Sequence, residues 1–387
     1  MYSKIILKPN RAKNVSNGHP WVFSKAILSC EKMEDGSLCE VWANEKFIGI
    51  GFYHSQTDIA IRILTREQEE ITEEFFYKKF CVLRDLKKQY IGDTNAYRAV
   101  FAESDGIPGL VVDIYNEVIV PQIHILAIEK HWSIIFPALL RAFSPKGVYL
   151  KLSKKSARRE GVKMEEGILL GDVPRDVEIK ENGMKFLVNI AEGQKTGFFL
   201  DQRENRQSVT SYTKDRKVLN CFSYTGGFSV ATARSAKSVA SLDISELATE
   251  YAKKNFEING LRGENYTFIT DDAFDFLRKL KKDEYDCIIL DPPSMARDKS
   301  QVRNAIKAYV TINSEVLKAL PKGGILATAS CTAHIDEELF LKILYQSAVN
   351  ASCDLRVLHR GNQPFDHGQS ILFPEGKYLK FYIFIKE

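Results

Sequence analysis

The sequence lacks the features of a membrane protein, a secreted disulfide-rich protein or a zinc protein. Its seven cysteines include no Cys-x-x-Cys pair and no histidine at zinc-ligand spacing, so reduced thiols are favoured over a metal site or a disulfide framework. No stretch reaches the roughly 18 apolar residues of a membrane helix. The first residues also lack the apolar segment of a signal peptide. We therefore expect a soluble cytoplasmic protein with no metal ion and no membrane partner.

Strong net charge is also absent, because the chain carries only +4 at pH 7. The distribution is more informative: residues 1–30 contain five Lys and Arg and no acid, and residues 151–163 contain six bases against Glu160 alone. Such clusters neutralise RNA phosphates or lie in solvated loops, and the sequence leaves both readings open. The candidates for RNA contact are Lys13, Lys154, Lys155, Arg158 and Arg159.

The length of 387 residues allows two or three domains. Short strands separated by Asn17-Gly18 and Asp35-Gly36 predict a small β barrel over residues 1–70. Residues 71–175 predict a compact α+β unit, with one helix starting near Phe75 and another over residues 131–143. A third domain, residues 176–387, starts with a predicted hairpin at Asn182-Gly183.

From residue 217 onward, short apolar strands alternate with amphipathic helices. This pattern predicts an α/β fold, a doubly wound parallel sheet with helices on both faces. The expected strands are 217–221, 238–243, 266–270, 285–290, 323–329 and one near 378–385.

Polar residues follow the first three of these strands, where ligands of open α/β sheets bind. The first strand runs into a glycine-bearing loop, but the dinucleotide fingerprint G-x-G-x-x-G is absent. Asp243, followed by Ile244, ends the second strand, where a carboxylate accepts hydrogen bonds from ribose hydroxyls. Asp272, followed by Ala273, is placed either to hold an adenine amine or to cap a helix. The candidate ligand residues of the first loop are Phe222, Tyr224, Thr225, Gly226 and Gly227.

The fourth and fifth strands end in groups that suit chemistry on a nucleobase. Asp291-Pro292-Pro293-Ser294 follows the fourth strand, and Cys331 follows the fifth. A cysteine at that position is either a nucleophile facing a substrate base or inert packing, and cysteine statistics alone favour packing. Asp291 and Cys331 are the predicted catalytic pair, and residues 292–294 are predicted to contact the substrate.

These segments, in this order, resemble class I S-adenosylmethionine (SAM)-dependent methyltransferases. Residues 193–206 and 222–228 are similar to the RlmI family of ribosomal RNA cytosine-5 methyltransferases. Residues 19–23 and 51–55 resemble the PUA domain of that family, and residues 103–113 resemble its central domain. The resemblance implies a PUA-like β barrel, a small α+β domain and a Rossmann-like methyltransferase domain. It also implies SAM as cofactor, S-adenosylhomocysteine (SAH) as product and RNA, specifically 23S rRNA, as partner.

The resemblance further implies that Gln194, Lys195 or Arg203 lies near the methionine end of SAM. Carbon 5 of cytosine is a poor nucleophile, so its methylation needs a thiolate to add at carbon 6, the role expected of Cys331. Asp291 is expected to hold the base edge. The group that removes the carbon 5 proton stays open between Asp291, water and His334. Phe198, Phe199 and Tyr309 either receive a flipped base or pack in the core.

Two other functions fit parts of the pattern. Asp291-Pro292-Pro293 also suits an amino-group methyltransferase, which needs no cysteine, although such enzymes usually carry an aromatic residue where Ser294 stands. A non-catalytic RNA-binding ribosome-assembly factor would keep the fold as a scaffold, but the set of Asp243, Asp272 and Asp291 argues against it. The missing phosphate fingerprint disfavours a nicotinamide oxidoreductase. The oligomeric state stays open, with a homodimer as one option.

Overall fold

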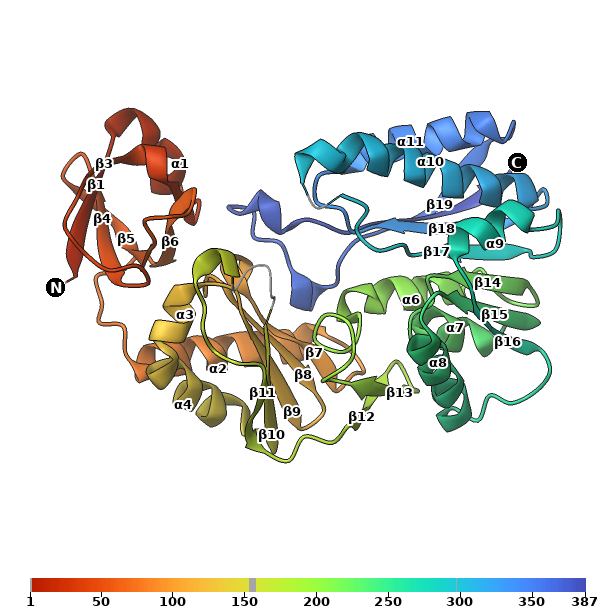
Figure 1. The fold of residues 1–387 in the computed structure, drawn as a ribbon, viewed down its shortest axis with the longest axis horizontal. Coiled ribbons are helices and arrows are strands. Elements are labelled where there is room, and N and C mark those ends of the chain that lie inside the picture. The colour runs from red at the N-terminus through yellow and green to blue at the C-terminus, as the bar shows by residue number, and fades with distance from the viewer. Residues whose placement is uncertain (1, 153–157, 297) are drawn as a thin grey trace. The chain divides into compact units, whose positions relative to one another are not determined.

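The computed structural model describes residues 2–152, 158–296 and 298–387, and Figure 1 shows the course of the chain. These residues form two compact units. The N-terminal unit runs to Ile179 and includes Val188–Leu200 and Phe365–Gly376. The C-terminal unit comprises Lys180–Leu187, Asp201–Pro364 and Lys377–Glu387. The prediction divides the chain into three consecutive domains, with boundaries at residues 70 and 175. Two segments of the predicted third domain, Val188–Leu200 and Phe365–Gly376, instead belong to the N-terminal unit. The three-domain division stays a prediction.

The first part of the N-terminal unit is a six-stranded sheet in the order β2-β6-β5-β4-β1-β3, around a core that includes Ile5, Val41 and Ile61. Its strands are β1 (Ser3–Leu7), β2 (Trp21–Phe23), β3 (Ile27–Cys30), β4 (Leu38–Ala43), β5 (Lys46–Tyr53) and β6 (Ile59–Thr65), with the short helix α1 (Lys13–Ser16). This sheet covers the region, residues 1–70, for which the sequence predicts a small β barrel. The sequence prediction missed β2 and β3, because strands of three and four residues are too short to show an alternating pattern.

The second part is a five-stranded sheet in the order β11-β10-β9-β8-β7, packed against helices. Its elements are α2 (Glu73–Tyr90), β7 (Ala96–Phe101), β8 (Leu110–Tyr115), β9 (Val118–Ile123), α3 (Leu126–Lys130), α4 (Trp132–Phe143), β10 (Gly147–Leu152) and β11 (Gly167–Gly171). The side chain of Thr72 caps α2 by accepting a hydrogen bond from the amide of Phe75. The helix then buries Phe76 and Phe80 in the core.

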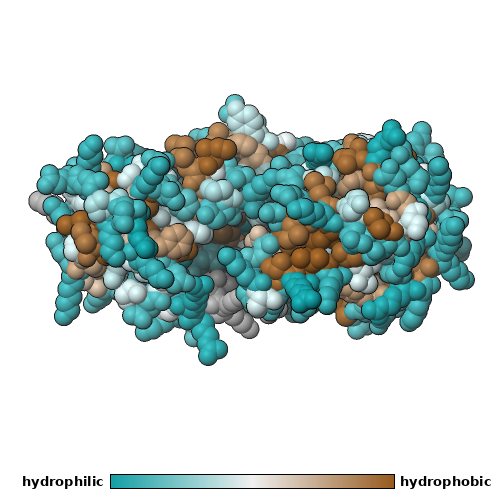
Figure 2. Space-filling model, turned by 90° about the horizontal axis from the view of Figure 1, so that it is seen from above, coloured by the Kyte–Doolittle hydropathy of each residue, from teal (hydrophilic) through white to brown (hydrophobic). Residues whose placement is uncertain are grey.

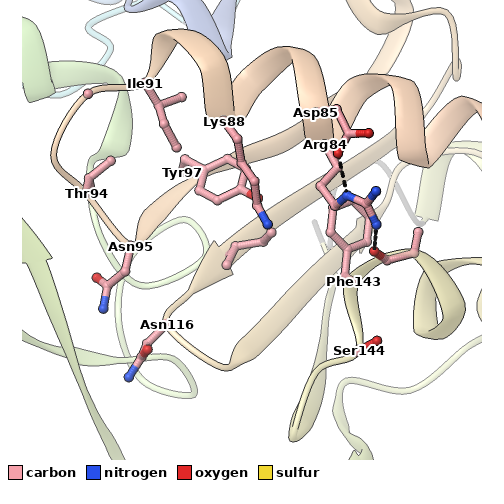
Figure 3. Close-up of a pocket in the computed structure, with 13 residues that line it drawn as sticks. Arg84, Asp85, Lys88, Ile91, Thr94, Asn95, Tyr97, Asn116, Phe143 and Ser144 are labelled. Atoms are coloured by element: carbon pink, nitrogen blue, oxygen red, sulfur yellow. Dashed lines mark hydrogen bonds and ion pairs between the residues drawn. The ribbon is translucent and has the colours of Figure 1, made fainter.

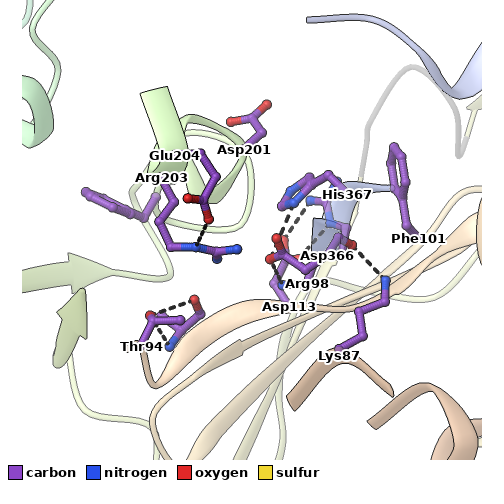
Figure 4. A network of polar contacts seen from close by, with 12 residues as sticks. Lys87, Thr94, Arg98, Phe101, Asp113, Asp201, Arg203, Glu204, Asp366 and His367 are labelled. Carbon is purple, nitrogen blue, oxygen red and sulfur yellow. Dashed lines mark hydrogen bonds and ion pairs between the residues drawn. The ribbon is translucent and has the colours of Figure 1, made fainter. Parts of the chain in front are cut away.

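A buried polar network fixes two distant segments to this part of the N-terminal unit (Figure 4). Arg98 donates two hydrogen bonds of 2.8 Å to the fully buried carboxylate of Asp113, which also accepts one of 2.6 Å from Thr196. Asp366 accepts a hydrogen bond from the amide of Arg98, and its carbonyl accepts one from Lys87. The segments Val188–Leu200 and Phe365–Gly376 are therefore held by charged groups that the low-dielectric interior makes costly to separate.

The hairpin of β12 (Asp176–Glu181) and β13 (Met184–Asn189) forms as predicted. Asn182 and Gly183 have φ values of 49° and 71°, the left-handed conformations that a two-residue type I′ turn requires.

Most of the C-terminal unit is a seven-stranded sheet in the order β16-β15-β14-β17-β18-β20-β19. Its strands are β14 (Lys217–Cys221), β15 (Ser238–Asp243), β16 (Tyr266–Thr270), β17 (Cys287–Leu290), β18 (Ile325–Ser330), β19 (Leu355–Gly361) and β20 (Lys380–Lys386). Its helices are α6 (Arg203–Thr210), α7 (Gly227–Ala233), α8 (Glu246–Ile258), α9 (Ala273–Lys279), α10 (Val302–Ala319) and α11 (Glu337–Asn350). Figure 1 shows α6–α8 on one face of the sheet and α9–α11 on the other.

The strands from β14 to β18 are parallel, whereas β20 runs antiparallel to both of its neighbours. The predicted strands are all present within two residues of their expected ends. The prediction missed β19, an edge strand whose side chains are mostly exposed or half-buried and whose sequence carries two arginines and a histidine. A strand with that composition shows no apolar run.

No helix in the described ranges is long and apolar enough to cross a lipid bilayer. Hydrophilic side chains cover much of the face shown in Figure 2, and apolar side chains gather there in separate patches.

Candidate active site

The strand order reverses between β14 and β17, and this reversal defines the place where open α/β sheets bind ligands. The chain proceeds from β14 outward to β15 and β16, then returns to β17 on the other side of β14. The loops at the carboxyl ends of β14 and β17 therefore diverge. These loops begin at Phe222 and Asp291, as predicted for the two halves of the site.

The loop after β14 has a strained backbone. Phe222, Tyr224 and Gly226 have φ values of 59°, 48° and 80°, and such conformations in residues other than glycine cost free energy. A Cβ at Gly226 would lie 3.1 Å from the Cβ of Ala252 in α8, so glycine lets the loop approach that helix. The buried Thr225 hydroxyl has no hydrogen-bond partner in the described protein. A strained loop with an unsatisfied buried polar atom is typical of a ligand site.

Asp243 lies at the carboxyl end of β15 and supports this loop. Its carboxylate accepts hydrogen bonds from the amides of Tyr224, at 2.8 Å, and Ser245, at 3.0 Å. The next residue, Ile244, is 70% exposed and presents an apolar side chain at the same edge. The arrangement offers a carboxylate beside an apolar surface, which suits a nucleoside.

Asp272 caps helix α9, the second of its two predicted roles. One carboxylate oxygen accepts hydrogen bonds from the amides of Phe274 and Asp275. Ala273 is buried at the start of the helix. Both capping bonds use Oδ1 and neither uses Oδ2. Capping is therefore compatible with ligand binding.

Asp291 is held by a relay of amide side chains that sequence reasoning missed. Gln202 donates a hydrogen bond of 2.8 Å to the carboxylate of Asp291, and Asn205 donates one of 2.6 Å to the side-chain oxygen of Gln202. Both amides are almost fully buried. The relay fixes the orientation of the Asp291 carboxylate. The spacing of Gln202 and Asn205, one helical turn apart, is the signal that could have identified them.

Thr332 joins the loop after β17 to the end of β18. Its hydroxyl accepts a hydrogen bond of 3.2 Å from the amide of Met295 and lies 3.1 Å from the hydroxyl of Tyr309. Pro292 is buried, whereas Pro293 and Ser294 are exposed. Tyr309 itself is fully buried in the core, as expected for a packing residue. Its ring is not exposed to receive a flipped base.

Tyr309 lies next to the residue that follows Cys331, because its hydroxyl is 3.1 Å from that of Thr332. Burial raises the pKa of Tyr309 to about 12, and the charges of Cys331 and Asp291 add to the shift. Leu290 pairs with Thr328 in the parallel register of β17 and β18. Asp291 and Cys331, which follow these strands, therefore lie at the same edge of the sheet. The predicted catalytic pair is therefore brought together by adjacent strands.

The other cysteines of this sheet differ from Cys331. Cys221 and Cys287 are fully buried within strands, and burial raises the pKa of Cys287 to about 12 and that of Cys221 further. Cys331 is only half-buried and follows its strand. His334 is exposed. Of these three thiols, only that of Cys331 is open to a substrate.

A lysine that the sequence analysis did not select lies beside Cys331. Lys380, the first residue of β20, pairs with Ser330 in the register of β18 and β20. Its buried ammonium group donates hydrogen bonds of 2.8 Å to the carbonyls of Thr332 and Tyr378.

The predicted residues of the Gln194–Arg203 segment fall in different units. Gln194 and Lys195 are exposed in the N-terminal unit, where the ammonium of Lys195 lies 4.4 Å from the ring centroid of Phe199. Phe198 is buried there. Arg203 starts α6 in the C-terminal unit, is 1% exposed and pairs with Glu204 at 3.2 Å.

The predicted RNA-contacting bases are only partly described. Lys13, Arg158 and Arg159 are exposed, and Arg159 lies 3.9 Å from Asp58. Lys154 and Lys155 lie outside the described residues.

A cavity of about 710 Å³ opens in the N-terminal unit between α2, β7 and the end of α4 (Figure 3). Arg84 and Lys88 contribute positive charge to its wall, and Arg84 is engaged by Asp85 and by the carbonyl of Ala142. The residues predicted to bind cofactor or RNA do not contribute to the wall of this cavity in the described chain. The same ranges contain no group of three or more His, Cys, Asp or Glu that could hold a metal ion.

The unsatisfied Thr225 hydroxyl, the close approach at Gly226 and the carboxylate of Asp243 together fit an adenosyl ligand such as SAM. A doubly wound sheet with an antiparallel strand inserted next to its edge, and with this loop at its switch point, defines a class I methyltransferase fold.

Comparisons with known proteins agree with this class. A family model for S-adenosylmethionine-dependent methyltransferases matches residues 148–368, and a PUA-like domain model matches residues 5–66. Ribosomal RNA large subunit methyltransferase I of Pseudoalteromonas atlantica is 39% identical over 388 residues, covering 98% of each chain. The enzyme of the same name from Aeromonas salmonicida is 37% identical over 385 residues, covering 97% of each chain. The chain therefore belongs to the ribosomal RNA large subunit methyltransferase I family, within the SAM-dependent methyltransferases.

Solved structures show the same fold. A protein assigned as a methyltransferase and crystallised with SAH superposes with a TM-score of 0.85 at 23% identity, covering 99% of each chain. A protein from Streptococcus mutans, assigned as a SAM-dependent methyltransferase, gives a TM-score of 0.82 at 23% identity and the same coverage. The class I methyltransferase fold with an N-terminal PUA-like domain, predicted from the sequence, is confirmed.

Proposed function

We propose that this protein transfers a methyl group from SAM to carbon 5 of a cytosine in large-subunit (23S) ribosomal RNA. One observation carries the proposal: Cys331 and Asp291 end adjacent parallel strands beside the strained loop after β14. An amino-group methyltransferase has no use for a thiol at that place. The relatives that cover almost the whole chain are named for large-subunit rRNA, which supports the substrate. A protein with that substrate works in the cytoplasm.

The cofactor lies across the carboxyl ends of β14, β15 and β16 in this proposal. Asp243 accepts hydrogen bonds from the ribose hydroxyls, and Ile244 covers one face of the adenine. Asp272 and Ala273 lie at the adenine edge. The loop residues Phe222, Tyr224, Thr225, Gly226 and Gly227 surround the remainder. Within the C-terminal unit Arg203 is the candidate for the methionine end, and the alternatives Gln194 and Lys195 stay predictions from the family resemblance.

The chemistry begins at Cys331. Its thiolate adds to carbon 6 of the cytosine and makes carbon 5 electron-rich. Asp291, oriented by Gln202, holds the base edge and stabilises the charge that develops during this addition. Bound SAM supplies an electrophilic methyl group for carbon 5. Loss of the carbon 5 proton then lets Cys331 leave, with Asp291 or a water as the proton acceptor; the exposed His334 is the third candidate.

The RNA is bound by exposed bases in the N-terminal part of the chain. Lys13 in α1 and Arg158 and Arg159 after β10 are available for phosphate contacts, and Lys154 and Lys155 belong to the same basic run of the sequence. Pro292, Pro293 and Ser294 face the target base.

Trapping with 5-fluorocytosine tests the proposed function directly. Fluorine at carbon 5 cannot leave as a proton does, so the adduct with Cys331 should persist after methyl transfer. We expect incubation of the full-length protein with SAM and 23S rRNA containing 5-fluorocytosine to give a covalent complex whose cross-linked peptide contains Cys331. Methylation of ordinary RNA without any trapped complex would refute the carbon 5 mechanism and favour an amino group as acceptor. No binding of SAM by the folded protein would refute both enzymatic functions.

Replacement of Asp243 by asparagine tests the cofactor site. A hydrogen bond to a charged group contributes about 1.5–3 kcal/mol, so we expect SAH affinity to fall roughly ten- to hundredfold. Isothermal titration calorimetry with SAH measures the change. D275N, on the exposed side of α9, is the control and should bind SAH like the unchanged protein. Equal affinities of D243N and the unchanged protein would remove Asp243 from the cofactor site.

A further inference from the structure

Lys380 combines three properties that bear on Cys331. It is 4% exposed, it starts the strand that pairs with the segment leading to Cys331, and its ammonium group is fixed by two carbonyl acceptors. One of those carbonyls belongs to Thr332, the residue after Cys331. The ammonium group is therefore locked beside the backbone that carries the thiol.

A buried cation needs a compensating anion, because burial without one is costly. Within the described residues, no carboxylate forms an ion pair with Lys380. The carboxylates that act electrostatically on Lys380 are those of Asp336 and Glu337, near the start of α11. Glu337 already accepts hydrogen bonds from Lys377, at 2.7 Å, and from Tyr382, at 2.6 Å. Asp336 caps α11 by accepting a hydrogen bond from the amide of Leu339, and Cys331 is a further group in the surroundings of Lys380 that can become an anion.

The charge state of Lys380 agrees with this arrangement. Burial lowers the pKa of Lys380 to about 8, while Cys331, Asp336 and Glu337 oppose the shift and Lys377 adds to it. The side chain therefore remains mostly protonated at pH 7.

We propose that Lys380 is a positioning residue that stabilises the Cys331 thiolate and so makes the thiol reactive at neutral pH. When Cys331 ionises, its proton passes to solvent and the thiolate pairs with the ammonium group already in place. Cysteines next to lysine have lowered pKa values for the same reason. This inference rests on the proposed role of Cys331 as nucleophile and adds the group that activates it.

The pH dependence of Cys331 alkylation tests the proposal without cofactor or RNA. The full-length protein is treated with iodoacetamide at a series of pH values, and mass spectrometry follows the peptide that contains Cys331. We expect the midpoint of the unchanged protein to lie below the ordinary value of about 8.5. K380M should raise the midpoint by about one pH unit or more, which lowers the alkylation rate at pH 7 roughly tenfold. K380R, which keeps the positive charge, should have an alkylation midpoint close to that of the unchanged protein.

Lys386 offers a matched control on the same strand. Its ammonium group also donates to two carbonyls, those of Leu317 and Leu320, at the opposite end of β20. K386M should therefore leave the alkylation midpoint of Cys331 unchanged. An unchanged midpoint in folded K380M, or a midpoint of about 8.5 or higher in the unchanged protein, would overturn the proposal. Failure of the proposed function gives a different pattern, in which C331A retains methyl transfer whatever K380M does to alkylation.

Discussion

Replacing Cys331 by alanine should lower the rate of methyl transfer to rRNA on the order of 10⁴-fold or more, because the thiolate addition at carbon 6 has no substitute. The other sheet cysteines are buried and cannot reach a substrate. The affinity for SAH should stay unchanged, because the cofactor residues end other strands. Single-turnover assays with radiolabelled SAM, together with calorimetry for SAH, separate the two effects.

C353A is the appropriate control for this experiment. Cys353 is half-buried in the same unit, but it precedes β19 and burial raises the pKa of its thiol. Its removal should leave methyl transfer intact. Substantial activity in C331A would assign the reaction to an exocyclic amine held by Asp291, and the product nucleoside would then be N-methylated.

Breaking the ion pair between Arg206 and Glu181 should give the largest loss of stability. The guanidinium of Arg206 donates hydrogen bonds of 2.7 and 2.6 Å to the two carboxylate oxygens of Glu181, and both side chains are almost completely buried. R206M leaves a buried carboxylate without its cation, which should lower the free energy of unfolding of the C-terminal unit by about 3–5 kcal/mol. The pair joins β12 to α6, so the backbone amides of the hairpin and of the helix should both exchange hydrogen for deuterium faster.

Hydrogen–deuterium exchange of peptides from β13 and α6 is the suitable measurement, because all three tryptophans, at positions 21, 42 and 132, lie in the N-terminal unit. R278M removes an exposed ion pair with Asp275 and should cost at most about 1 kcal/mol. The double variant E181L/R206M should recover much of the loss, since no uncompensated charge remains. A loss in R206M as small as in R278M would show that the Arg206 pair contributes little.

The sequence was sufficient to predict the elements that carry a clear apolar pattern. The central strands β14, β17 and β18 carry apolar runs because helices cover both faces of the sheet. The edge strand β19 carries no such run. The return of Phe365–Gly376 to the N-terminal unit depends on Asp366 meeting Arg98, a contact between residues far apart in the chain.

The same distinction applies to the site. Asp243, Asp291 and Cys331 could be selected because each follows a strand in a recognisable position. Gln202 and Lys380 act on these residues from elements distant in sequence, so their roles depend on tertiary pairing. One local feature of the sequence indicates Lys380: it is a charged residue at the start of the apolar strand that ends at Lys386.

The antiparallel direction of β20 has a consequence for the order of folding. Parallel strands present their last residues at the carboxyl edge of the sheet, whereas β20 presents its first residue, Lys380, at that edge. Because β20 lies between β18 and β19 and follows both in the chain, β19 joins the sheet only when β20 has inserted. On the proposed role of Lys380, Cys331 stays an ordinary thiol in every partly folded chain. Its raised reactivity then arises only when β20 has completed the sheet.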